Sequence, residues 1–83
     1  MAFLRSILGA RELGPVLAYM SILESLKATR RPLTTKQAAE MLGLHPMTVY
    51  KWSRTGRIPT LRLGGALRFD PQALAAWLEA RSV

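Results

Sequence analysis

The stretch from Leu33 to Phe69 predicts two short helices, a tight turn between them, and a basic β-hairpin. The whole chain has 83 residues, which is enough for one small domain, or for one small domain with an added helix. A chain of this length buries a limited core and often gains stability from a tail packed against it. The order of these elements therefore restricts the fold more than the composition does.

The first helix of this stretch begins with a capping box. Thr34 is placed to accept a hydrogen bond from the amide of Gln37, whose side chain reaches back to Thr34, and Leu33 precedes them as a hydrophobic staple. The helix is expected over residues 35–42 and ends at Gly43, which tolerates a positive φ. Its inward positions are Ala38, Met41 and Leu42.

The second helix is expected to start near His45, with His45 as N-cap and Pro46 in the first helical position. Val49 and Trp52 are three residues apart and should face the core. Thr55-Gly56 ends the helix. Five side chains remain for its outer surface: Met47, Thr48, Tyr50, Lys51 and Arg54.

A β-hairpin is predicted next, from the strand-like runs Thr60–Leu63 and Ala66–Phe69 joined by Gly64-Gly65. Simple alternation along the chain places Arg62 and Arg68 on one face of the hairpin. The other face then carries Leu61, Leu63, Leu67 and Phe69. A last helix then follows, capped by Asp70 with Pro71 in its first position. Its buried stripe is expected at Leu74, Trp77 and Leu78.

The first 29 residues predict an additional helical segment. We expect a short helix or a frayed end over Phe3–Leu8, a break or a helix start at Gly14-Pro15, and a firm helix over about Pro15–Ala28. Its apolar positions recur at helical spacing: Leu13, Val16, Leu17, Met20, Leu23 and Leu26. The predicted organisation is an N-terminal helical extension with a basic linker over residues 1–31, followed by the hairpin-containing domain over residues 32–83.

The positive charge is concentrated on the middle of the chain. Residues 30–68 contain eight lysines and arginines and a single acid, Glu40, which gives this segment a net charge of +7, while the charges of the two flanks cancel. A segment of this kind favours a polyanionic partner, because neutralising phosphates releases condensed counterions.

Catalysis and cofactor binding are poorly supported. Cysteine is absent, His45 is the single histidine, and no pair of carboxylates has a useful spacing, so we expect a protein without catalytic residues, metal or cofactor. Arg5 interrupts the apolar run at the N-terminus, and no stretch reaches the ~18 continuous apolar residues of a membrane span. No signal peptide is recognisable, and we expect a cytoplasmic protein without membrane contact.

The segment from Leu33 to Leu78 resembles the small winged helix-turn-helix domains of the excisionase and MerR-like superfamily. The positions that carry the resemblance are Leu33-Thr34, Gln37-Ala38-Ala39, Leu42-Gly43, Thr48-Val49, Trp52, Gly56, Ile58-Pro59, Arg62, Gly64, Arg68-Phe69 and Trp77-Leu78. The sequence departs from the family at His45, where Ser, Asn or Asp is more usual. The expected fold is thus mainly α: a winged helix-turn-helix with a two-stranded β-hairpin wing, a C-terminal helix and an extra N-terminal helix.

This resemblance implies a non-catalytic protein that binds double-stranded DNA, with the second helix in the major groove and the wing at an adjacent minor groove or the backbone. Base edges would be read by Met47, Tyr50, Lys51 and Arg54. Phosphates would be contacted by Lys36, Thr48, Lys51, Arg57 and Arg68, with Arg62 and Arg68 as the contacts of the wing. No small-molecule effector is expected.

Several roles remain open from the sequence. Members of the family act as recombination directionality factors that bend attachment-site DNA or as transcription regulators, and the sequence does not separate the two. The apolar N-terminal helix also fits self-association, or a protein-interaction adaptor that docks a larger partner. RNA binding is a third possibility, but the chain lacks an exposed aromatic cluster suited to stacking single-stranded bases.

Overall fold

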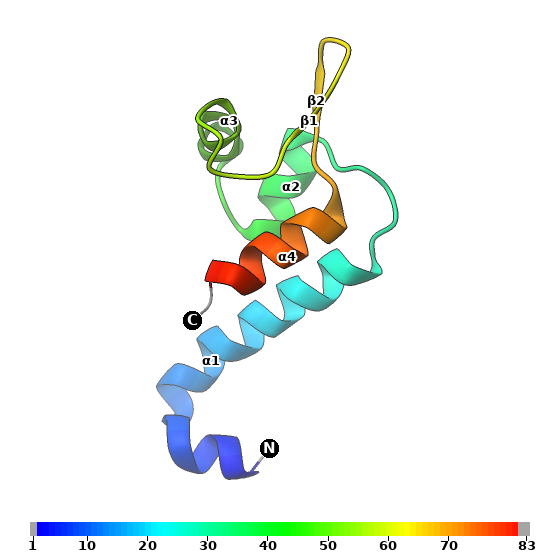
Figure 1. Ribbon diagram of the computed structural model, residues 1–83. Coiled ribbons are helices and arrows are strands. Elements are labelled where there is room, and N and C mark those ends of the chain that lie inside the picture. The colour runs from blue at the N-terminus through cyan, green and yellow to red at the C-terminus, as the bar shows by residue number, and fades with distance from the viewer. Residues whose placement is uncertain (1, 82–83) are drawn as a thin grey trace.

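A computed structural model describes residues 2–81, with side chains from Gly14 onward. Within these residues the chain forms four helices and one antiparallel hairpin, which we call the wing (Figure 1). The elements are, in order, α1 (Ala2–Ala28), α2 (Thr35–Leu42), α3 (Pro46–Arg54), β1 (Leu61–Leu63), β2 (Ala66–Arg68) and α4 (Pro71–Arg81). This arrangement confirms the predicted fold class.

The helix α1 is longer than predicted. It runs from Ala2 to Ala28 with Pro15 inside it, so the break expected at Gly14-Pro15 and the separate helix over Phe3–Leu8 are wrong. Proline lacks the N–H that would bond to the preceding turn, and inside a helix this loss often bends the axis without ending the helix. Figure 1 shows the axis of α1 changing direction toward its N-terminal end.

The C-terminal half of α1 is part of the packed body. Leu26 is fully buried, and α1 packs along α4 and against α2. The side-chain amide of Gln72 on α4 donates to the carbonyl oxygens of Lys27 and Thr29, at 3.0 and 3.3 Å. The buried core comprises Leu26, Leu33, Ala38, Ala39, Val49, Ile58, Phe69, Leu74 and Ala75.

The predicted start of α2 is confirmed by its cap. The Gln37 amide donates to the Thr34 hydroxyl at 3.1 Å, and the Thr34 amide donates to the Gln37 side chain at 3.0 Å. Gly43 ends α2 with a φ of 69°, a left-handed conformation that favours glycine.

The caps of α3 and α4 are also as predicted. At α3 the Met47 amide donates to Nδ1 of His45 at 3.1 Å, so an imidazole nitrogen takes the place of the usual cap oxygen. At α4 the two carboxylate oxygens of Asp70 accept from the amides of Gln72 and Ala73, at 3.4 and 3.3 Å.

The pairing of the wing differs from the alternation expected from the sequence. Leu61 lies opposite Arg68, Arg62 opposite Leu67, and Leu63 opposite Ala66. Residues directly opposite each other in an antiparallel pair share a face of the ribbon. Arg62 and Arg68 therefore lie on opposite faces, and the assignment of both arginines to one face is wrong.

The wing is joined to the body at its base. Leu33, just before α2, and Phe69, just after β2, exchange two backbone hydrogen bonds of 2.8 Å each, and the Phe69 side chain is fully buried. Beyond this bridge the hairpin projects away from α1 and α4 and lies beside α3 (Figure 1). This bridge thus anchors a ribbon whose first strand is exposed and whose second strand is half-buried.

Candidate nucleic-acid interface

One side of α3 packs against the core, which leaves the side chains on its other side accessible. Val49 is fully buried and Ser53 nearly so, and the Ser53 hydroxyl donates to the carbonyl oxygen of Tyr50 at 2.7 Å. The opposite side of α3 leaves Met47, Tyr50, Lys51 and Arg54 exposed and Thr48 half-buried. The structure thus brings the five predicted residues of this helix onto its accessible side.

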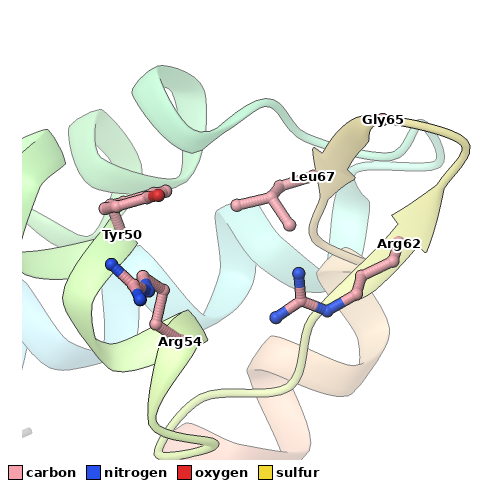
Figure 2. Close-up of a pocket in the computed structure, with 5 residues that line it drawn as sticks. All are labelled: Tyr50, Arg54, Arg62, Gly65 and Leu67. Carbon is pink, nitrogen blue, oxygen red and sulfur yellow. The ribbon is translucent and has the colours of Figure 1, made fainter.

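A cleft separates α3 from the wing. It has a volume of about 490 Å³ and is lined by Tyr50 and Arg54 of α3 and by Arg62, Gly65 and Leu67 of the hairpin. In Figure 2 the Arg62 and Leu67 side chains extend from the hairpin toward α3, while the Arg54 side chain lies next to the Tyr50 ring. The pairing of Arg62 with Leu67 explains why both side chains lie on the same side of the wing.

The cleft is positively charged without a protein counter-ion. Among the side chains of residues 14–81, the one ion pair joins Lys27 and Glu79, at 3.3 Å, and it lies between α1 and α4. The Arg54 guanidinium lies 5.9 Å from the centre of the Tyr50 ring. Two guanidinium groups lining one cleft without a carboxylate partner make it suited to an anion with several acceptor oxygens, such as a phosphate.

Six of the nine predicted site residues do not line this cleft: Met47, Thr48 and Lys51 on α3, and Lys36, Arg57 and Arg68 elsewhere. Arg68 is half-buried on the other face of the wing, and its Nη1 donates to the Leu67 carbonyl at 2.7 Å. Arg57 stacks over the Trp52 ring, with its guanidinium carbon 5.4 Å from the ring centre. The side chain of Lys36 is exposed on α2. None of the three lines the cleft.

Sequence reasoning missed two residues of the cleft and one aromatic contact. Gly65 and Leu67 line the cleft, and a two-residue loop at Gly64-Gly65 would have placed Leu67 opposite Arg62. Arg81 stacks over Trp77 at 4.7 Å. Their spacing of four along a helix was the available signal for that contact.

The described residues offer no sign of metal or membrane chemistry. Among the side chains of residues 14–81, no group of three or more histidine, cysteine, aspartate or glutamate residues could hold a metal ion. In the same part of the chain, no helix combines the length and hydrophobicity that crossing a bilayer requires.

Comparison with known proteins agrees with this geometry. A family model described as a helix-turn-helix domain matches residues 32–82, more than half of the chain. The chain belongs to this helix-turn-helix family. The match supports the resemblance to small excisionase-like and MerR-like domains, and it supports DNA as the partner. Comparisons with curated proteins and with solved structures gave no match.

The family match also marks which parts of the fold are general and which are additions. The helix-turn-helix pair consists of α2 and α3, and the matched segment also includes the wing and α4. Helix α1 lies outside it. Even so, Leu26 of α1 belongs to the same buried core as Val49 and Leu74, so the added helix contributes to the packing of the family's domain.

Proposed function

We propose that this helix-turn-helix protein binds double-stranded DNA without catalysing a reaction, with α3 in the major groove and the wing at the adjacent minor groove. The major groove, about 12 Å wide, admits an α-helix. The side chains available there are those of Met47, Tyr50, Lys51 and Arg54, all exposed on α3. A methionine suits the methyl group of thymine, and arginine and lysine suit the acceptors of guanine.

The cleft between α3 and the wing is the observation that carries this proposal. Neighbouring major and minor grooves are separated by one sugar–phosphate strand. If α3 and the wing occupy neighbouring grooves, that strand runs through the cleft lined by Arg54, Arg62 and Tyr50. Arg62 then approaches its phosphates from the wing, while Arg54 lies where this strand borders the major groove. Neither arginine has an ion-pair partner among the side chains of residues 14–81.

The remaining predicted residues are proposed as phosphate contacts. Thr48 is half-buried and Lys51 exposed on α3, and Lys36 is exposed on α2. Arg57 and Arg68 lie outside the cleft and would act at the periphery. Contacts of this kind position a protein on the duplex, while base contacts provide the sequence preference.

The proposed biological role is that of a small DNA-bending factor of the excisionase type, or of a transcription regulator. One domain of this size makes few contacts, so we expect binding to repeated sites. The two roles separate in an assay. A bending factor changes the products of an integrase on attachment-site DNA, whereas a regulator changes transcription from a promoter without any recombinase.

A duplex titration at several salt concentrations tests the proposal. Arg54→Ala should weaken binding by on the order of 1–3 kcal/mol if it reads a base edge. Lys51→Ala, which removes a proposed phosphate contact, should lower the salt slope by about one. Arg81→Ala is the matched control, because it removes one guanidinium from α4, outside the cleft. Binding by Arg54→Ala equal to that of the parent protein at every salt concentration would contradict the assignment of α3.

A second candidate role is protein binding through α1, as an adaptor or by self-association. Leu17 and Met20 on α1 are 52% and 46% exposed, which is high for large apolar side chains on one helix. Sedimentation velocity over a range of concentrations tests self-association. Self-association predicts concentration-dependent dimers, and a Leu17→Ser, Met20→Ser variant should then stay monomeric. If the parent protein is monomeric at every concentration, self-association is excluded and the adaptor role remains. That role is tested by isolating a protein partner that binds the parent but not the Leu17→Ser, Met20→Ser variant.

A further inference from the structure

The face of the wing that points away from the cleft carries two exposed leucines. Leu61 is 42% exposed and Leu63 is 56% exposed, and they lie on the same side of β1. Their cross-strand partners are Arg68 and Ala66. The wing therefore has two faces: a cleft face with Arg62 and Leu67, and an outer face on which Leu61 lies opposite Arg68 at the base and Leu63 lies opposite Ala66 at the tip.

The end of the wing is slender and lacks hydrogen-bonding side chains. From Leu63 to Ala66 the sequence is Leu-Gly-Gly-Ala, and Gly64 turns with a φ of 63°. A tip without side chains at its two central positions fits the minor groove, which is only about 6 Å wide. It presents no arginine, asparagine or glutamine side chain to read the acceptors on the groove floor.

The alternation along β1 places the leucines on the groove side when the wing is docked. Arg62 lies between Leu61 and Leu63 in the sequence and faces the cleft, where the sugar–phosphate strand is proposed to run. The outer face of the ribbon then turns away from that strand, toward the interior of the minor groove. A leucine there cannot hydrogen-bond to base edges, so its favourable contacts are sugar rings and the faces of bases at an opened step.

We propose that Leu63 is an apolar wedge that enters a base step of the minor groove next to α3, with Leu61 packed against the neighbouring sugars. This inference rests on the proposed DNA binding and deepens it. Side chains inserted in this way partly unstack the step and kink the duplex toward the major groove, by roughly 20–90° in known examples. Bending would then come from a single bound molecule, without a filament of several copies.

The test measures the bend on a short duplex with one binding site, selected from random DNA by the parent protein. Fluorescence resonance energy transfer between dyes at the two ends reports the bend when the site is saturated. The parent should shorten the end-to-end distance, and Leu63→Ala and Leu63→Asn should lose most of that shortening. Leu63→Met should retain it, since methionine keeps an apolar side chain of similar length.

The three variants differ only at an exposed position, so circular dichroism should show the fold of the parent for each. Equal bending by Leu63→Asn and the parent, or a parent that binds without bending, would overturn the wedge and leave the proposed DNA binding intact. A second copy docked on the leucines would instead show as lost cooperativity on two-site duplexes with an unchanged single-site bend, which also overturns it. A parent that fails to bind duplex at any salt concentration would remove the proposed function itself.

Discussion

The helix α3 and the wing form the two sides of the same cleft, but they are held in very different ways. Helix α3 is capped by His45, and its inner face is closed by Val49 and Ser53 in the core. The wing has strands of three residues, every residue of β1 is exposed, and its anchor is the bridge between Leu33 and Phe69. An isolated two-stranded hairpin is at best marginally stable in water. From this difference we expect α3 to be fixed before any binding and the wing to be the part whose position can adjust.

Removal of the anchor should have the largest effect. Phe69→Ala deletes a fully buried aromatic ring at the base of the wing, and we expect a loss of about 3–5 kcal/mol in the free energy of unfolding. Leu61→Ala, on the exposed ribbon, should change it by less than about 0.5 kcal/mol. Urea unfolding followed by circular dichroism measures both. Similar losses for the two variants would show that the wing is not held at Phe69.

The two arginines of the wing should differ in their effect on DNA affinity. Arg62 lines the cleft and Arg68 does not, so Arg62→Ala should cost about 1.5–3 kcal/mol of binding free energy through a lost charge-assisted hydrogen bond. Arg68→Ala should cost less, and its effect should be confined to the salt dependence. Titration of the same duplex with both variants measures the difference. The opposite order of the two losses would mean that the outer face of the wing contacts the phosphates.

The capping box of α2 should contribute a smaller amount. Thr34→Ala removes the hydroxyl that accepts from the Gln37 amide, and N-cap losses of this kind typically cost about 1 kcal/mol. The cost should appear in thermal unfolding, because α2 supports the position of α3. If the melting curves of variant and parent coincide, the cap does not stabilise the helix pair.

The ion pair between α1 and α4 should matter least. The side chains of Lys27 and Glu79 are about half exposed, and exposed pairs contribute roughly 0.2–1 kcal/mol. Glu79→Gln should lower the unfolding free energy by that amount at low salt, and the difference should vanish at high salt because of screening. A difference that persists at high salt would indicate a contribution from packing.

The parts of the fold that the sequence could predict are those set by local chemistry. Thr34 with Gln37, His45 with Pro46, and Asp70 with Pro71 specify helix starts through hydrogen bonds between near neighbours. Gly43, which ends α2, and Gly64, in the hairpin loop, act through their positive φ, which is again a local property. The outer side chains of α3 followed from the spacing of Val49 and Trp52.

The parts that were not predicted depend on relations between segments. The side chains of the wing were assigned to its two faces by counting alternate residues along the chain. In a hairpin with a two-residue loop, however, an odd-numbered residue pairs with an even-numbered one, so Arg62 and Arg68 lie on opposite faces. The position of Arg57 over the Trp52 ring required knowledge of the path of the chain after α3. Helix α1 continues through Pro15, which no local rule decides, because proline both starts and bends helices.

The pairing of Trp52 with Trp77, whose ring centres lie 6.1 Å apart, gives the protein an internal optical reporter. The chain has no other tryptophan, so its indole emission arises from the junction of α3 and α4. Trp77 donates its Nε1 hydrogen to the Arg57 carbonyl at 2.8 Å, and separation of the two helices would expose both rings to water. Emission therefore tracks the integrity of that junction, while Tyr50 stands alone as the aromatic lining the cleft.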